Sequence, residues 1–261
     1  MNYLRHKAPQ DVWINGASLR GASDKICSVR LVDQSGAPEI SIGGYGGRDG
    51  SLVTSHRVKS RTVKVQFGLR GVFNISDRIR ALDQVNAWAA DGILTWSERP
   101  GQRLTGICSH AAEIGDAFDI TKTYEIEFTA YGVPFWEDIS PRMLSTSGTS
   151  ATESIMIPGS AATVLDAIIT PSTSISTLTI SAASADKTTS MVFIDLSTSA
   201  VIRIEHTDGI LTLKAGTTDI SAKRTINSDD ELIVYPGKVA TVSVSASASV
   251  AAVVSARGRW M

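Results

Sequence analysis

Hydrophobic and polar residues alternate along several short segments in the first half of the chain. Between residues 62 and 67, valine and phenylalanine hold every second position, with threonine, lysine and glutamine between them. Successive side chains of a strand point to opposite faces, so this pattern predicts a strand buried on one side. Residues 12–16, 25–32 and 124–131 predict further strands, and Pro134 ends the last one because proline cannot donate to a sheet.

One segment, residues 75–90, has the spacing of an amphipathic helix. Asn74 or Ser76 can cap its first turn, and Asp77 lies where the helix dipole favours a negative charge. Gly92 follows the segment and can take the left-handed conformation that ends a helix. Apolar residues recur every three or four positions and predict one buried stripe, made of Ile75, Ile79, Leu82, Val85 and Ala89.

A hairpin is predicted directly after this helix. Its strands are residues 93–96 and 102–108. The turn between them reads Ser97-Glu98-Arg99-Pro100-Gly101, and proline and glycine are the residues that turns favour.

The second half of the chain has the pattern of an all-β domain. Short strand-like segments separated by turn sequences favour a β-sandwich. From residue 241 to residue 249, Ser or Thr alternates strictly with Val or Ala, which favours an ordered strand over a low-complexity tail. Residues 138–152 are interpreted as a boundary or an extended connection. The predicted strands are 153–157, 177–181, 191–196, 201–206, 210–214, 232–235, 240–245 and 251–256.

Composition supports two domains of different character. The chain has 261 residues, and 13 of its 16 aromatic residues lie before position 137, whereas Ser, Thr, Ala and Val dominate the remainder. We therefore predict domains at residues 1–138 and 139–261. The 43% hydrophobic and 20% charged residues, with a net charge of −1, are typical of a soluble globular protein and argue against a dedicated nucleic-acid binder.

Other sequence features exclude further classes of protein. No run of 18 apolar residues is present, so no membrane span is expected, and no signal-peptide core follows the first residues. Cys27 and Cys108 lack the spacing of a zinc site and are expected to be reduced core thiols, although a disulfide between them stays open.

Candidate chemistry is sparse. The glycine-rich residues 43–50 lack the lysine of a phosphate-binding loop and favour a structural or interface loop. Glu125 and Glu127 share a strand face that we expect to be solvated. No nucleophile elbow occurs, and no two of the four histidines have metal-ligand spacing. We therefore expect no catalytic, cofactor-binding or metal site, and no enzyme. The histidines are His6, His56, His110 and His206.

A basic cluster is the most notable charge feature. It comprises Arg57, Lys59, Arg61 and Lys64. On a monomer such a cluster is usually a solvated strand edge. In a ring of identical subunits it would be repeated around the axis, where it could face an acidic partner or DNA in transit.

The order of these motifs resembles the distal tail proteins of bacteriophages with long non-contractile tails. In the first half, the resemblance rests on the glycine-rich loop, the strand at 61–67, the helix with Trp88, the hairpin and the strand that ends before Pro134-Phe135-Trp136. In the second half, it rests on Tyr235-Pro236-Gly237-Lys238 and on the closing Arg257-Gly258-Arg259-Trp260.

The resemblance implies a mainly β fold with one principal helix. An N-terminal α+β domain (β-sandwich, helix and β-hairpin arm) would form a homohexameric ring, and a galectin-like β-sandwich would follow it. The ring would be a hub in the virion tail tip, assembled in the host cytoplasm. It would join the major tail tube protein to the tail-associated protein at the tip, let DNA pass, and in some members carry receptor-binding proteins on the C-terminal domain. No cofactor is implied.

The resemblance also assigns a candidate oligomer interface. The hairpin matches the family's protruding arm, which contacts the neighbouring subunit. Its candidate residues here are Trp96, Arg99, Pro100, Gly101 and Arg103. A carbohydrate-binding adhesion module, resting on the sandwich at 139–261, is the alternative function.

Overall fold

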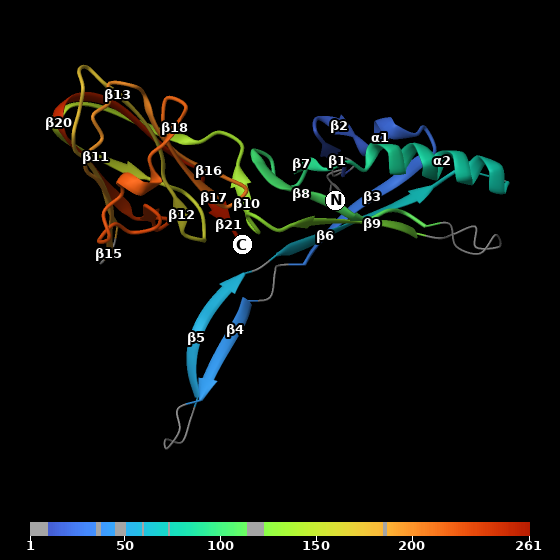
Figure 1. Cartoon of the computed structure of the whole chain (residues 1–261). Helices are drawn as coiled ribbons and strands as arrows, with labels where there is room; N and C mark the ends of the chain where they lie inside the picture. The colour runs from blue at the N-terminus through green and yellow to red at the C-terminus, as the bar shows by residue number, and fades with distance from the viewer. Residues whose placement is uncertain are drawn as a thin grey trace, which may run out of the picture. The chain divides into compact units, whose positions relative to one another are not determined.

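The computed structural model describes residues 10–34, 38–44, 51–58, 60–72, 74–113, 123–184 and 187–261. The chain divides into two compact units, Met1–Phe135 (unit 1) and Trp136–Met261 (unit 2). The fold is mainly β with one principal helix, as the sequence predicts (Figure 1).

Unit 1 is built on an antiparallel sheet with the strand order β2-β1-β7-β8-β9-β6-β3. Its strands β6 and β9 pair along their full lengths, with Val65 opposite Ile126. The strands are β1 (Val12–Ile14), β2 (Ala17–Ser18), β3 (Ile26–Gln34), β6 (Arg61–Leu69), β7 (Gly92–Trp96), β8 (Gln102–His110) and β9 (Thr123–Ala130).

The alternation predicted for residues 62–67 is present in β6. Val63, Val65 and Phe67 are buried, and the residues between them are half-buried on the other face. On β9 the buried positions include Tyr124 and Ile126, and the rings of Phe67 and Tyr124 stack with their centres 5.6 Å apart. This face is therefore the core of unit 1.

Two helices accompany the sheet: α1 (Leu19–Ala22) and α2 (Ile75–Trp88). The Asn74 side chain caps α2 by accepting a hydrogen bond from the Asp77 amide at 2.7 Å, which confirms one of the two predicted caps. The buried face of α2 is rotated from the predicted stripe. Leu82 and Val85 are buried, but the stripe's first two isoleucines are exposed, and Arg78 and Ala81 are buried in their place.

Strands β4 (Pro38–Gly44) and β5 (Ser51–Val58) form a separate two-stranded sheet, here called the ribbon. Figure 1 draws them as a pair of antiparallel strands. Among the described strands they hydrogen-bond only to each other. Most of the glycine-rich loop, residues 45–50, lies outside the described residues.

Unit 2 is a sheet that curls around one apolar core, as in a β-sandwich. The strand order is β15-β14-β20-β13-β16-β17-β18, and β11 pairs with β20. Strands β12 and β19 pair with each other, as do β10 and β21. The elements are β10 (Trp136–Asp138), β11 (Arg142–Met156), β12 (Thr163–Val164), β13 (Asp166–Pro171), β14 (Leu178–Ser184), β15 (Lys187–Phe193), β16 (Ile202–Thr207), β17 (Ile210–Ala215), β18 (Thr218–Asp219), η1 (Ser221–Lys223), β19 (Ile233–Val234), β20 (Val239–Ala256) and β21 (Arg259–Trp260).

The long strand β20 organises this unit. Its first half pairs with β14 and its second half with β13, while β11 runs beside it throughout. The register of β11 shifts after Gly148, whose φ of +136° lies in a region that favours glycine. Even-numbered Val and Ala residues of β20 face the core, so the predicted alternation is confirmed as one strand rather than two.

Two segments differ from the sequence prediction. Residues 142–152, expected within a boundary or connection, form one strand (β11) together with most of the predicted strand at 153–157, and residues 166–171 form β13, for which the sequence predicts no strand. The structural boundary falls after Phe135 because β10 pairs with β21 at the C-terminal end of unit 2, with Trp136 opposite Trp260.

Candidate subunit interface

The β7–β8 turn is compact. The Arg99 amide donates to the Trp96 carbonyl at 3.0 Å, and the Gln102 amide donates to the Arg99 carbonyl at 3.2 Å. Gly101 has a φ of +79°, and a Cβ there would meet no atom within 4 Å. The turn therefore needs glycine for its backbone conformation rather than for space.

The turn is fastened to the segment that precedes β1. The Ser97 amide donates to the Asp11 carbonyl at 3.1 Å, and the Asp11 amide donates to the Ser97 hydroxyl at the same distance. Gln10 Nε2 donates to Glu98 Oε1 at 2.6 Å. The predicted arm is thus tied into unit 1 at its tip, whereas the independent two-stranded element of this unit is the ribbon.

Arg99 joins the turn to the centre of the sheet. Its Nη2 lies 3.5 Å from Asp33 Oδ2, and the same carboxylate accepts hydrogen bonds at 2.8 Å from Arg61 Nε and Nη2. Arg61 is only 2% exposed. Partial burial lowers the pKa of Arg99, while the Asp33 charge opposes this shift. Asp33 was not among the predicted residues, because no local pattern links it to arginines 28 and 66 positions away.

Two of the four side chains of the predicted basic cluster, those of Arg61 and Lys64, are described, and both are ion-paired. Lys59 and the Arg57 side chain lie outside the described residues, and Arg61 is buried against Asp33. Lys64 Nζ lies 2.6 Å from Glu125 Oε1 and 2.8 Å from Glu127 Oε1. These described cations are therefore paired with carboxylates that the linear sequence does not bring beside them.

This pairing shifts the protonation equilibria of the partners. The hydrogen bonds to Glu125 and then Glu127 raise the pKa of Lys64 above the ordinary lysine value. The hydrogen bonds from Lys64 and from Gln66 lower the pKa of Glu125. The two glutamates thus lie on a half-buried, ion-paired face rather than a fully solvated one.

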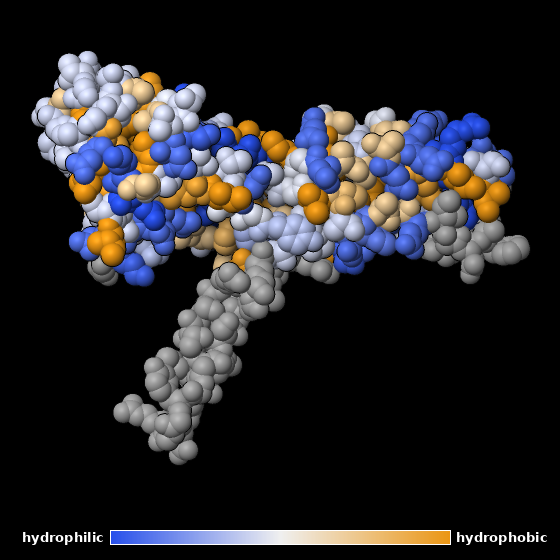
Figure 2. All heavy atoms as spheres, viewed as in Figure 1, coloured by the Kyte–Doolittle hydropathy of each residue, from blue (hydrophilic) through white to orange (hydrophobic). Residues whose placement is uncertain are grey.

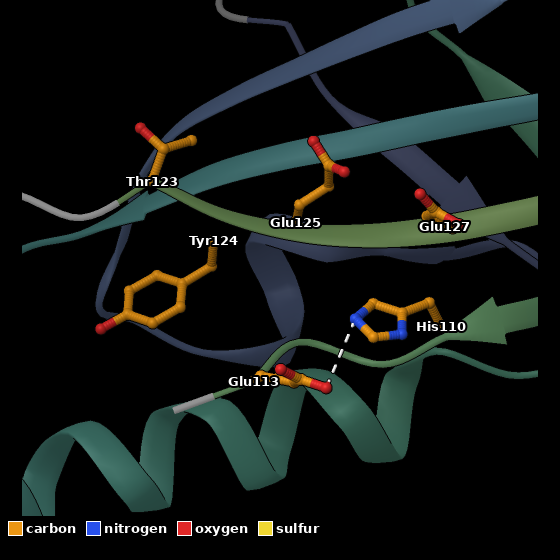
Figure 3. A pocket seen from close by; sticks show the side chains of 6 residues that line it. All are labelled: His110, Glu113, Thr123, Tyr124, Glu125 and Glu127. Carbon is orange, nitrogen blue, oxygen red and sulfur yellow. Dashed lines mark ion pairs between the residues drawn. The ribbon is translucent and has the colours of Figure 1, made fainter. Parts of the chain in front are cut away.

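A surface hollow of about 310 Å³ lies at the start of β9. Figure 3 shows Glu125 and Glu127 on β9, with His110 at the end of β8 directed toward Glu113. His110 Nε2 lies 3.6 Å from Glu113 Oε1. In the described part of the chain, no group of three His, Cys, Asp or Glu side chains could hold a metal ion.

The face of the sheet opposite the core carries two exposed isoleucines that sequence reasoning missed. In the strand register, Leu94 lies opposite Leu104 on the buried face and Ile93 opposite Thr105 on the other. Ile107 shares that second face and lies opposite Thr129. Ile93 is 36% and Ile107 42% exposed. The alternation of residues along β7 and β8 could have predicted that Ile93 and Ile107 lie on the face opposite the core, but it does not show that the two side chains are neighbours.

The cysteines and the remaining histidines form no shared site. Cys27 is exposed and Cys108 half-buried, so neither is the core thiol expected, and both are free. Strands β6 and β9 separate them, a distance of about 14 Å at normal strand spacing, which is too far for a disulfide.

His206 Nδ1 lies 2.9 Å from Asp166 Oδ1 in unit 2. His6 lies outside the described residues, as does the side chain of His56.

Hydrophobic and hydrophilic residues are mixed on the visible surface of the molecule. Figure 2 shows hydrophobic residues (orange) interspersed with hydrophilic ones (blue) across the visible side of both units. None of the helices in the described ranges is long and apolar enough to span a membrane.

Comparison with known proteins identifies the fold. No protein-family model and no curated protein matches the sequence. The crystal structure of the Dit (gp 19.1) protein of phage SPP1, described as a paradigm of the hub adsorption apparatus in phages that infect Gram-positive bacteria, matches with a TM-score of 0.64 and 16% identity. The match covers 95% of this chain and 98% of that chain. The chain therefore has the fold of a phage distal tail protein.

Two structures of the phage P2 baseplate in its activated conformation match more weakly. The calcium form has 10% identity, a TM-score of 0.33 and coverage of 83% of this chain and 89% of that chain. The strontium form has 10% identity, a TM-score of 0.36 and coverage of 90% and 96%.

Proposed function

We propose that this protein is a structural hub at the distal end of a phage tail. It assembles as a homohexameric ring that joins the tail tube to the tail-tip proteins, and its bore lets DNA pass. The observation that carries this proposal is the match to the SPP1 Dit fold over nearly the whole of both chains. Because one fold can serve several functions, the assembly itself must be tested.

The architecture of unit 1 supports a role in self-assembly. It has an antiparallel sheet with an exposed apolar pair on one face, and it has a ribbon that pairs with no other described strand. A ring requires two different surfaces on each subunit, because a contact between identical surfaces closes as a two-fold dimer. We assign the arm that the resemblance implies to the ribbon rather than to the β7–β8 turn.

The β7–β8 turn remains a candidate contact surface, and hydrogen bonds to Asp11 hold it in place. Pro100 and Gly101 are exposed at its tip, and Arg99 and Trp96 are half-buried at its sides. Arg103 is half-buried on β8. Because the turn is tied to Asp11, these residues can meet a partner without a large loss of backbone entropy.

Further partners follow from the hub role. Within the virion tail tip, unit 1 meets the major tail tube protein and the tail-associated protein, and unit 2 carries receptor-binding proteins. Assembly takes place in the host cytoplasm, the role is non-enzymatic, and DNA is only in transit through the bore.

No structural observation favours the carbohydrate-binding alternative over this role. Sugar-binding sites commonly use exposed aromatic platforms. In unit 2, Trp136 and Phe193 are buried, while Tyr235 and Trp260 are half-buried. The indole Nε1 of Trp260 donates to Asp138 at 2.9 Å, which holds that ring in place.

Light scattering after size-exclusion chromatography tests the proposed function. A hexamer of the 27.7 kDa chain has a mass of about 166 kDa. We expect this species, alone or after addition of the tail tube protein of the same phage. A chain that stays monomeric at every concentration and does not bind the tube protein would overturn the proposal.

A further inference from the structure

Strand β11 forms an open edge of the large sheet in unit 2. Among the described strands it pairs only with β20, which lies along one of its two sides. No loop of the described chain hydrogen-bonds to the backbone of residues 142–156. The N–H and C=O groups on the outer side of this 15-residue strand therefore have no partner within the described chain.

The other two edges of this sheet are protected. Strand β18 has only two residues. On β15, the Ser190 amide donates to the Asp229 carboxylate at 2.6 Å, and the Val192 amide donates to the Ser228 hydroxyl at 2.9 Å. Natural edge strands are short or covered, or they carry lysine or proline, because an open edge pairs with other strands. The sequence of β11 contains neither lysine nor proline, so this edge is available for pairing.

Two charged residues, Arg142 and Glu153, determine which strand fits this edge. No other residue of β11 is charged, and both side chains are exposed. In the register with β20, Arg142 lies opposite Ala256 and Glu153 opposite Val242, and both of these partners are core residues. Residues that lie opposite each other share a face, so both charges lie on the core side of the sheet. A charge on that side opposes the addition of a strand, because the strand would cover it without neutralising it.

We propose that β11 pairs with β11 of a second copy of this chain in an antiparallel, two-fold symmetric contact. One register sets Arg142 of one copy opposite Glu153 of the other. Symmetry then sets Glu153 of the first copy opposite Arg142 of the second. The second copy thus supplies the opposite charge at both places, which an unrelated strand does not.

The same register matches the two faces of the strand. Leu144 of one copy lies opposite Ala151 of the other, and both are half-buried. Ser145 lies opposite Ser150, and both are exposed. This match depends on the irregularity after Gly148, where the register with β20 shifts, because strict alternation would place residues 142 and 153 on opposite faces. A two-fold contact differs from the head-to-tail contact of a ring, so the inference goes beyond the proposed function.

Reversal of the two charges tests the pairing. Arg142→Glu and Glu153→Arg each replace two opposite-charge pairs with two like-charge pairs, so the dissociation constant of the contact should rise at least about tenfold. The double variant, and a 1:1 mixture of the two single variants, again set opposite charges in register and should associate as the unmodified chain does. Lys238→Glu, at another exposed site of unit 2, is the control and should change nothing. Analytical ultracentrifugation measures association, and circular dichroism confirms folding.

Disulfide cross-linking tests the register itself. In a background of Cys27→Ser and Cys108→Ser, Ser145→Cys and Ser150→Cys are made in separate chains. Directly opposite Cα atoms of antiparallel strands are about 4.5–5.5 Å apart, within the range of a disulfide. Oxidation of the mixture should therefore give a cross-linked dimer. Either variant alone should give none, because its two cysteines are five residues apart along the strands, about 17 Å.

The outcomes separate this inference from the proposed function. The contact doubles the mass of what the chain otherwise forms, whether the 27.7 kDa monomer or a ring. A dimer without any hexamer would support the β11 contact and contradict the hub. A hexamer that doubles at no concentration would support the hub and overturn the β11 contact, and a chain that stays monomeric would overturn both. Association of the single charge variants equal to that of the unmodified chain would also overturn the contact, as would cross-linking of Ser145→Cys with itself.

Discussion

Asp33 is the residue whose replacement tests the account of unit 1 most sharply. Its carboxylate accepts two hydrogen bonds of 2.8 Å from the buried Arg61 and lies 3.5 Å from Arg99 on the β7–β8 turn. Asp33→Asn keeps the size of the side chain but removes its charge. The Arg61 guanidinium, buried in the sheet, then faces an amide in place of a carboxylate.

The expected loss of stability follows from the burial of this pair. Two charges 4 Å apart attract by about 4 kcal/mol at an effective dielectric constant of 20. Removing one partner of a buried ion pair typically costs about 3–5 kcal/mol, because the other charge stays in the protein with less compensation. We expect about 3 kcal/mol for Asp33→Asn. The double variant Asp33→Leu with Arg61→Met should recover most of it, because apolar replacement removes both buried charges.

Urea unfolding followed by tryptophan fluorescence and circular dichroism measures this loss. The transition of unit 1 should shift to lower urea concentration, while the transition of unit 2 stays in place. Asp24→Asn is the matched control, because the Asp24 side chain is 82% exposed and its ion pair with Lys25 should contribute less than about 0.5 kcal/mol. If Asp33→Asn shifts the unit 1 transition no more than Asp24→Asn, the buried pair does not stabilise the sheet as argued.

Three other expectations concern separate parts of the chain. The pKa of Glu125 is lowered by Lys64, so its contribution to stability is present above the ordinary value of 4.5 and is lost as the pH falls below it. Thermal melts should show a weaker acid dependence for Glu125→Gln, and an unchanged dependence would contradict the pairing. Phe193 is fully buried, so Phe193→Ala should destabilise unit 2 by about 3–5 kcal/mol in urea and leave the unit 1 transition unmoved. A thiol reagent should modify Cys27 before Cys108, because burial shelters Cys108 and raises its pKa, and equal rates by mass spectrometry would be inconsistent with the structure.

Elements with a strong local pattern could be predicted from the sequence. The helix, Ile75–Trp88, could be predicted because its capping residue, Asn74, directly precedes a segment with helical spacing of apolar residues, although the buried face of the helix is not the predicted one. Strand β20 could be predicted because its strict alternation of small polar and apolar residues fits a sheet with one buried face. In both elements the information lies within one short stretch of chain.

Elements that depend on distant partners could not be predicted in the same way. Residues 142–152 carry no fully buried side chain, and they form a strand because they pair with β20 about 100 residues later. The burial of Arg61 depends on Asp33, which lies on another strand, so a sequence pattern could show only a cluster of positive charge. The predicted buried face of α2 is wrong at Ile75 and Ile79, because the elements packed against a helix decide which of its faces is covered.

The candidate interface also combines a feature that local sequence predicts with contacts between distant segments that it does not predict. The β7–β8 hairpin was predicted with its turn in the right place, and local turn chemistry is sufficient for that. Its fastening to Asp11 and Gln10 is not local, and neither is the separation of the ribbon from the main sheet. Strand pairing distinguishes the two hairpins, since β7 and β8 belong to the main sheet and β4 and β5 pair only with each other among the described strands, while the hairpin that contacts a neighbouring subunit stays a prediction.

Negative-stain electron microscopy of the purified protein tests the central proposal most directly. A hub that encircles a bore predicts particles with six-fold symmetry and a central hole, formed by the chain alone or together with the tail tube protein. Only particles of the size of a single chain at every concentration, both with and without the tube protein, would contradict it.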